Sequence, residues 1–168
     1  MSRSNIDILH VKTLIRSFDS QFLILHRRSC DLIEKVPDKD LFLKPRELDR
    51  TVGPFSCGEC ILRSGAMVEK TFGGITTRLW DDPFEWTLPE KLNDKAAVVN
   101  YLDEVEATRQ KGLAFFTSDD DLQRQIPAPE KLTSIIEILL ETLVRASHYQ
   151  GRAFAVFQML TGERPPRI

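Results

Sequence analysis

SIIEILLETLVRASHYQGRAFAVFQML, residues 134–160, carries the longest uninterrupted helical pattern in the chain. Its apolar residues recur at spacings of three and four, which predicts one long amphipathic helix. Ser134 and Glu137 form a capping-box pattern at its start, and Gly162 followed by two prolines predicts its end. The residues that a helical wheel places at the centre of the apolar stripe are Ala146, Gln150, Ala153 and Phe157, with Ser147 also inward.

Three earlier stretches show the same periodicity. The first predicted helix runs from Val11 to Val36 and stops before Pro37. The second begins at Pro54 and the Ser56-x-x-Glu59 capping box and ends at Gly73-Gly74. The third is capped by Asn93-Asp94 and ends near Thr117. In the third helix the residues expected to face inward are Val98, Tyr101, Val105, Phe115 and Phe116, and those expected to face largely outward are Asp103, Glu104, Arg109 and Lys111.

No stretch shows a convincing strand pattern. Four amphipathic helices can bury their apolar stripes only against one another. The sequence therefore predicts an all-α four-helix bundle, with residues 1–168 as a single domain.

The predicted connections differ in character. Residues 38–53 indicate an ordinary loop, and Ser118 with the three following aspartates is expected to cap a short turn before extended structure at 126–129. The connection over residues 74–89 is longer and contains Trp80, Phe84 and Trp86. We expect these rings either to cap the end of the core or to form a lid or a dimerisation surface.

Composition and net charge argue against some classes of protein for this chain. The 168 residues are 42% hydrophobic and 29% charged, with a net charge of -2. This balance does not favour nucleic-acid binding, which concentrates basic charge on one face. No apolar run reaches the length of a membrane span. The opening MSRSNIDILH lacks the apolar core of a secretory signal, so we expect a cytoplasmic protein, in which the three cysteines are reduced.

The segment Cys57-Gly58-Glu59-Cys60 places two cysteines in the first turn of the second predicted helix. Backbone N–H groups at a helix N-terminus favour a thiolate, which makes a redox or metal-binding role chemically reasonable. A thioredoxin needs a preceding strand, and the all-helical peroxidase-type disulfide reductases have a histidine where this chain has Ser64. Zinc would need two further ligands, and Cys30, His26 and His148 are distant in sequence. The alternative is a pair of small buried thiols.

A second group of polar side chains interrupts the apolar pattern of the last helix. Arg145 and Tyr149 are four residues apart and share a helix face, with His148 and Arg152 beside them. One interpretation is a solvated flank or a helix–helix contact. The other is a shallow pocket completed by Arg63 and Glu69 of the second helix, in which guanidinium groups bind an anion.

The order of these elements resembles the DinB/YfiT-like family. The resemblance covers essentially the whole chain and rests on the long first helix, the capped second helix, the aromatic-rich connection, and a last helix containing His148-Tyr149-Gln150-Gly151-Arg152 before Gly162. It implies a bacterial four-helix bundle that forms a homodimer. Many family members bind a divalent metal through one histidine of the second helix and two of the fourth, and some are thiol-dependent S-transferases or isomerases.

Carried onto this chain, the histidine pair falls on Arg145 and Tyr149, and the second-helix ligand falls on Arg63. A guanidinium stays protonated and has no lone pair to donate, so we expect no metal at these positions and leave the cofactor unassigned. His26 lies at the edge of the first helix's apolar face, and we interpret it as partly buried and hydrogen bonded locally.

Three functional hypotheses follow, in this order. The first is a DinB-like protein that binds a small anion in a pocket formed by Arg63, Glu69, Arg145, His148 and Tyr149. The second is a metal- or thiol-dependent S-transferase with an atypical ligand set, for which His26, His148 and Glu69 are possible donors. The third is a redox protein that uses Cys57 and Cys60. None of them involves nucleic acid or a membrane.

Overall fold

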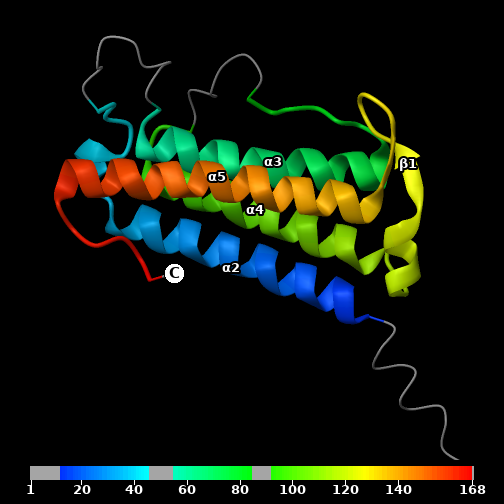
Figure 1. Ribbon diagram of the computed structural model, residues 1–168. Helices are drawn as coiled ribbons and strands as arrows, with labels where there is room; N and C mark the ends of the chain where they lie inside the picture. Colours follow the sequence, from blue (N-terminus) through cyan, green and yellow to red (C-terminus); the bar gives the residue numbers. More distant parts are fainter. Residues whose placement is uncertain (1–11, 46–54, 85–91, 168) are drawn as a thin grey trace, which may run out of the picture.

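The computed structural model describes residues 12–45, 55–84 and 92–167. Four α-helices occupy most of these residues: α2 (Thr13–Lys35), α3 (Cys57–Thr77), α4 (Lys95–Ala114) and α5 (Ile135–Thr161). They lie side by side as one bundle (Figure 1). Helix α3 packs against α4 and α5, and α2 packs against the same two helices, so α2 and α3 occupy opposite corners. The predicted all-α four-helix bundle is confirmed.

Local side-chain chemistry sets the helix ends. At the start of α3 the Ser56 N–H donates to Glu59 Oε2 (2.7 Å) and the Glu59 N–H donates to Ser56 Oγ (3.2 Å), which is the predicted capping box. Ser134 and Glu137 form the same arrangement at the start of α5. Asp94 caps α4 by accepting the Ala97 N–H at 2.8 Å. These starts are as predicted because caps depend on neighbours in the sequence.

The predicted end of the second helix is wrong. Helix α3 continues through Gly73-Gly74 to Thr77 and ends at Arg78, whose φ of 65° is left-handed. A Cβ on Gly74 would overlap the indole of Trp80. The glycine therefore accommodates a packed side chain within the helix instead of ending it. By contrast, the last helix, α5, ends as predicted, because Gly162 at φ 71° is its C-cap.

The third helix and the segment after it also depart from expectation. Helix α4 ends at Ala114, and Phe116 is buried whereas Phe115 is exposed. A 3-10 helix, η2 (Asp119–Gln123), follows Ser118 as predicted. The two short strands β1 (Gln125–Pro127) and β2 (Leu132–Ser134) then pair antiparallel, with Ile126 opposite Thr133. The expectation of no strand is wrong because three-residue strands are too short to show a period of two. A second 3-10 helix, η1 (Asp38–Asp40), follows α2.

The core includes the predicted centre of the last helix. Ala146, Gln150, Ala153 and Phe157 are all buried, whereas Ser147 is exposed and its predicted inward position is wrong. Gln150 is the polar member of this stripe, and its side-chain N–H groups donate to the Leu25 carbonyl oxygen (2.7 Å) and to Ser29 Oγ (2.8 Å) of α2. The buried amide is satisfied in this way and ties α5 to α2.

Polar contacts also join α3 to α5. Ser64 Oγ donates to the Ala146 carbonyl oxygen at 2.9 Å. The hydroxyls of Thr71 and Thr142 share a hydrogen bond of 2.6 Å. These buried bonds fix the register of the two helices, and residues of both helices line an open groove.

The aromatic connection is only partly described. Phe84 is buried, and its ring centroid lies 5.2 Å from that of Tyr101. Trp80 is partly buried, and its Nε1–H donates to the Pro127 carbonyl oxygen of β1 at 3.1 Å. Trp86 lies outside the described residues. None of the described helices combines the length and apolar character that crossing a membrane requires.

Candidate functional site

An open groove of about 850 Å³ lies along the α3–α5 face. Met67 and Lys70 of α3 line one side, and Trp80 and the β1–β2 connection line one end. On α5 the lining residues run from Glu137 to Arg152, which corresponds to about 22 Å of helix. The volume of the groove falls within the range of small-molecule sites.

The structure brings three of the five predicted pocket residues together. Arg145, His148 and Tyr149 all line the groove. Glu69 and Arg63 are not among its lining residues. The carboxylate of Glu69 instead accepts a hydrogen bond from the Tyr101 hydroxyl of α4 at 2.6 Å. Burial, followed by this bond to Glu69, raises the pKa of Tyr101.

The charged groups of the groove are unequally engaged. Arg145 forms an ion pair with Glu141 at 2.5 Å, one helical turn away, and both side chains are exposed. The carboxylate of Glu137 belongs to the cap of α5, where hydrogen bonds from Ser134 lower the pKa of Glu137. Within the described ranges, no carboxylate forms an ion pair with Lys70.

Two arginines converge on one aromatic ring near the Arg152 end of the groove. The Arg63 Cζ atom lies 4.4 Å from the Phe55 ring centroid, and the Arg152 Cζ atom lies 5.1 Å from the same centroid. Arg63 Nε is buried and has no hydrogen-bond partner among the described residues. Neither the Arg63 nor the Arg152 guanidinium forms an ion pair with another described residue. The arrangement concentrates positive charge from α3 and α5 at one place.

Cys57 and Cys60 lie in the first turn of α3, as predicted, and both are buried. Burial raises the pKa of Cys57 to about 12. Burial also raises the pKa of Cys60 to about 11, although Arg152 and Arg63 act in the opposite direction. Desolvation of the thiolates therefore outweighs the helix N-terminus that was expected to favour them. Both thiols are protonated at neutral pH.

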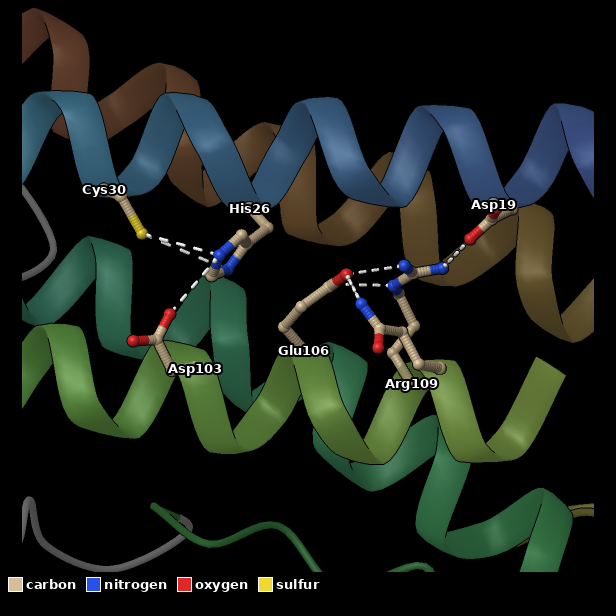
Figure 2. A network of polar contacts seen from close by, with 7 residues as sticks. Asp19, His26, Cys30, Asp103, Glu106 and Arg109 are labelled. Atoms are coloured by element: carbon tan, nitrogen blue, oxygen red, sulfur yellow. Dashed lines mark hydrogen bonds and ion pairs between the residues drawn. The ribbon is translucent and has the colours of Figure 1, made fainter. Parts of the chain in front are cut away.

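A separate polar network joins α2 and α4 (Figure 2). Arg109 was expected to face outward, but its side chain is only 2% exposed. Its Nε and Nη2 donate to the two carboxylate oxygens of Glu106 at 2.7 and 2.6 Å, and its Nη1 pairs with Asp19 Oδ1 at 2.5 Å. Burial alone would raise the pKa of Glu106, but hydrogen bonds from Arg109 and Gln110 lower it overall. The two carboxylates make burial of the guanidinium possible.

His26, Cys30 and Asp103 form a second cluster beside this network (Figure 2). His26 Nε2 lies 3.8 Å from Cys30 Sγ and 3.5 Å from Asp103 Oδ1. Burial, and then the charges of Asp103, Asp31, Glu34 and Glu106, raise the pKa of Cys30 to about 11. The spacing of His26 and Cys30 places them on adjacent turns, but Asp103 joins them only through the packing of α2 on α4.

Comparison with known proteins places the fold. No family model matches the chain, and no curated protein does. A solved DinB-like protein from Bacillus cereus superimposes with a TM-score of 0.71 and 12% identity, covering 91% of this chain and 96% of that one. The chain has the DinB-like fold. A DinB-like protein from Bacillus subtilis gives a TM-score of 0.66 and 18% identity, with 90% and 96% covered.

The family resemblance implies a divalent metal, so the residues at the implied ligand positions can be compared with what such a metal requires. The family resemblance carries the three histidine positions onto Arg63, Arg145 and Tyr149. Two guanidinium groups and a phenol do not fit a divalent cation, because a protonated guanidinium has no electron pair to donate. Arg63 also lies apart from the lining of the groove that Arg145 and Tyr149 share. These residues therefore do not form the family's metal site.

Some residues of interest carry no local signal in the sequence. Phe55 is a single aromatic residue before a cap, and only the structure places Arg63 and Arg152 against it. Trp80 lines the groove and is held there by its hydrogen bond to β1, a strand too short to predict.

Proposed function

We propose that this DinB-like chain binds a small molecule with one anionic group and an apolar body in the α3–α5 groove. The observation that carries the proposal is the Arg152 guanidinium, which lines the groove and, like the neighbouring Arg63, lies on the Phe55 ring with no described carboxylate as a partner. Unpaired cations beside an aromatic surface favour an anionic ligand, because bidentate hydrogen bonds then replace hydration.

The neighbouring side chains specify the rest of the ligand. Tyr149 precedes Arg152 by three residues on α5 and lines the groove, as do Met67 and Val144. This apolar surface suits an aromatic or aliphatic group attached to the anion. Lys70 supplies a second cation from α3. Arg145 contributes less, because Glu141 already neutralises it.

The experiment measures binding of phenyl phosphate to the reduced full chain by titration calorimetry. The Arg152→Gln variant should weaken binding about tenfold or more, since a hydrogen bond to a charged group contributes about 1.5–3 kcal/mol. Arg124→Gln is the matched control, because Arg124 is exposed and pairs with Asp121 outside the groove. Equal affinity of the Arg152 and Arg124 variants would overturn the proposal.

Inorganic phosphate and benzyl alcohol separate the two parts of the ligand. Each should bind more weakly than phenyl phosphate. Of these two compounds, inorganic phosphate should bind more weakly to the Arg152→Gln variant, whereas the affinity for benzyl alcohol should not change. Benzyl alcohol binding should instead weaken in the Tyr149→Ala variant. An affinity for phenyl phosphate no greater than that for inorganic phosphate would remove the apolar part of the proposal.

The other two hypotheses receive unequal support. The redox role of Cys57 and Cys60 is disfavoured by the burial that raises both pKa values. An S-transferase with atypical metal ligands draws support from His26, which the structure places beside two other donors. We also propose that the chain forms a homodimer, as the family resemblance implies.

A further inference from the structure

Three donor atoms of different type meet between α2 and α4, away from the α3–α5 groove. They are a ring nitrogen of His26, the sulfur of Cys30 and a carboxylate oxygen of Asp103, and all lie within 4.8 Å of one another. His26 and Cys30 are half-buried, whereas Asp103 is exposed. The same atom, His26 Nε2, is the closer ring nitrogen to Cys30 and also faces Asp103 (Figure 2).

Two of the three donor separations are close to the edge lengths of a metal coordination tetrahedron, and the third lies within 4.8 Å. Zinc bonds of about 2.3 Å to sulfur and about 2.0–2.2 Å to nitrogen and oxygen place neighbouring ligands roughly 3.3–3.6 Å apart at tetrahedral angles. The observed distances are 3.5 Å from His26 Nε2 to Asp103 Oδ1 and 3.8 Å from Nε2 to Cys30 Sγ. Closing the Cys30–Asp103 separation, which is within 4.8 Å, would complete the tetrahedral edges.

The surrounding charge favours a cation. Asp31, Glu34, Asp103 and Glu106 all act on Cys30 electrostatically, and all are acidic. The nearest buried cation, Arg109, is already paired with Glu106 and Asp19. A thiolate and a carboxylate would together balance the two positive charges of the ion, with a neutral imidazole as the third ligand.

We infer that His26, Cys30 and Asp103 bind one divalent cation of the zinc class. The nitrogen, sulfur and oxygen donor set suits zinc or cobalt better than magnesium or calcium, which prefer oxygen ligands alone. Binding releases the Cys30 proton to solvent. Three protein ligands leave a fourth position, which exposed Asp103 places within reach of water, as in exchangeable and catalytic zinc sites.

Cobalt provides a direct test, because thiolate coordination gives a charge-transfer band in the near ultraviolet. We expect the reduced full chain to develop this band with saturation at one equivalent of Co²⁺, and Zn²⁺ to remove it. The chain has three cysteines, so the Cys57→Ala/Cys60→Ala variant leaves Cys30 as the sole thiol and should keep the band. Cys30→Ala should lose it. No band in the wild-type chain, or a band that persists in Cys30→Ala, would overturn the inference.

A matched pair of carboxylate variants tests the third ligand. Asp103→Asn should weaken Co²⁺ binding roughly tenfold or more, the scale on which even indirect support of a metal site operates. Glu104→Gln removes the same charge from the adjacent exposed position and should change affinity less than about twofold. Equal losses in the two variants would show diffuse attraction to acidic residues and overturn the site. Far-ultraviolet circular dichroism checks that each variant is folded, and Asp103 is exposed enough for its variant to fold.

Discussion

Arg109 is the most completely buried charged side chain among the described residues. Hydrogen bonds to two carboxylates offset the free-energy cost of removing its guanidinium from water. Three donor–acceptor contacts of 2.5–2.7 Å join it to Asp19 of α2 and to Glu106 of its own helix. A buried charge is tolerated only with such pairing, and removing one partner leaves the other desolvated. The residue therefore links α2 to α4 only as long as both carboxylates are present.

Replacing Arg109 by Met should lower the free energy of unfolding by about 3 kcal/mol, because Glu106 remains buried without its partner. Urea unfolding followed by circular dichroism measures the loss. Arg124→Met removes an exposed pair with Asp121 and should cost less than about 1 kcal/mol. Similar losses for the two variants would contradict the role assigned to Arg109, whereas partial recovery in Arg109→Met/Glu106→Leu would support it.

At the scale of elements, two helical glycines have opposite surroundings. A Cβ on Gly74 of α3 would overlap the indole of Trp80, which is held by its bond to the Pro127 carbonyl oxygen. A Cβ on Gly151 of α5 would meet nothing within 4 Å. Alanine favours a helix over glycine by about 1 kcal/mol, so packing alone decides the sign of each substitution.

Gly151→Ala should stabilise the chain by about 0.5–1 kcal/mol, and Gly74→Ala should destabilise it. Thermal unfolding of the two variants measures both changes in stability, an increase for Gly151→Ala and a decrease for Gly74→Ala. In a Trp80→Ala background the Gly74→Ala change should become stabilising, because the overlapping ring is gone. Destabilisation that persists in that background would mean that Trp80 is not the cause.

The sequence could predict elements whose determinants are local, such as the Ser56-Glu59 and Ser134-Glu137 caps. It could not predict features created by packing. Gly73-Gly74 resembles a helix end until Trp80 is placed against it, and Arg109 resembles a surface residue until Asp19 approaches from α2. The groove residues Arg145, His148 and Tyr149 follow from one helix face, whereas Arg63 and Glu69 required the relative rotation of two helices.

At the scale of the whole molecule, we expect the proposed homodimer to form through exposed apolar side chains on α5. Leu140, Val144 and Met159 are 51%, 69% and 70% exposed. Light scattering should give about twice the chain mass of 19.3 kDa, and Leu140→Glu, at a residue outside the groove lining, should shift the chain towards the monomer. Leu132→Glu, on β2, should not. A wild-type mass of one chain would exclude the homodimer under those conditions.

Arg63 and Arg152, which form no ion pair within the described residues, lie together on Phe55 where α3 and α5 meet, and the proposed function rests on that placement. The most direct test is a crystal structure of the full chain with phenyl phosphate. It should show the phosphate within hydrogen-bond distance of the Arg152 guanidinium, with the phenyl ring in the groove against Tyr149. A phosphate bound elsewhere, with Arg152 and Arg63 contacting only Phe55 and solvent, would contradict the account.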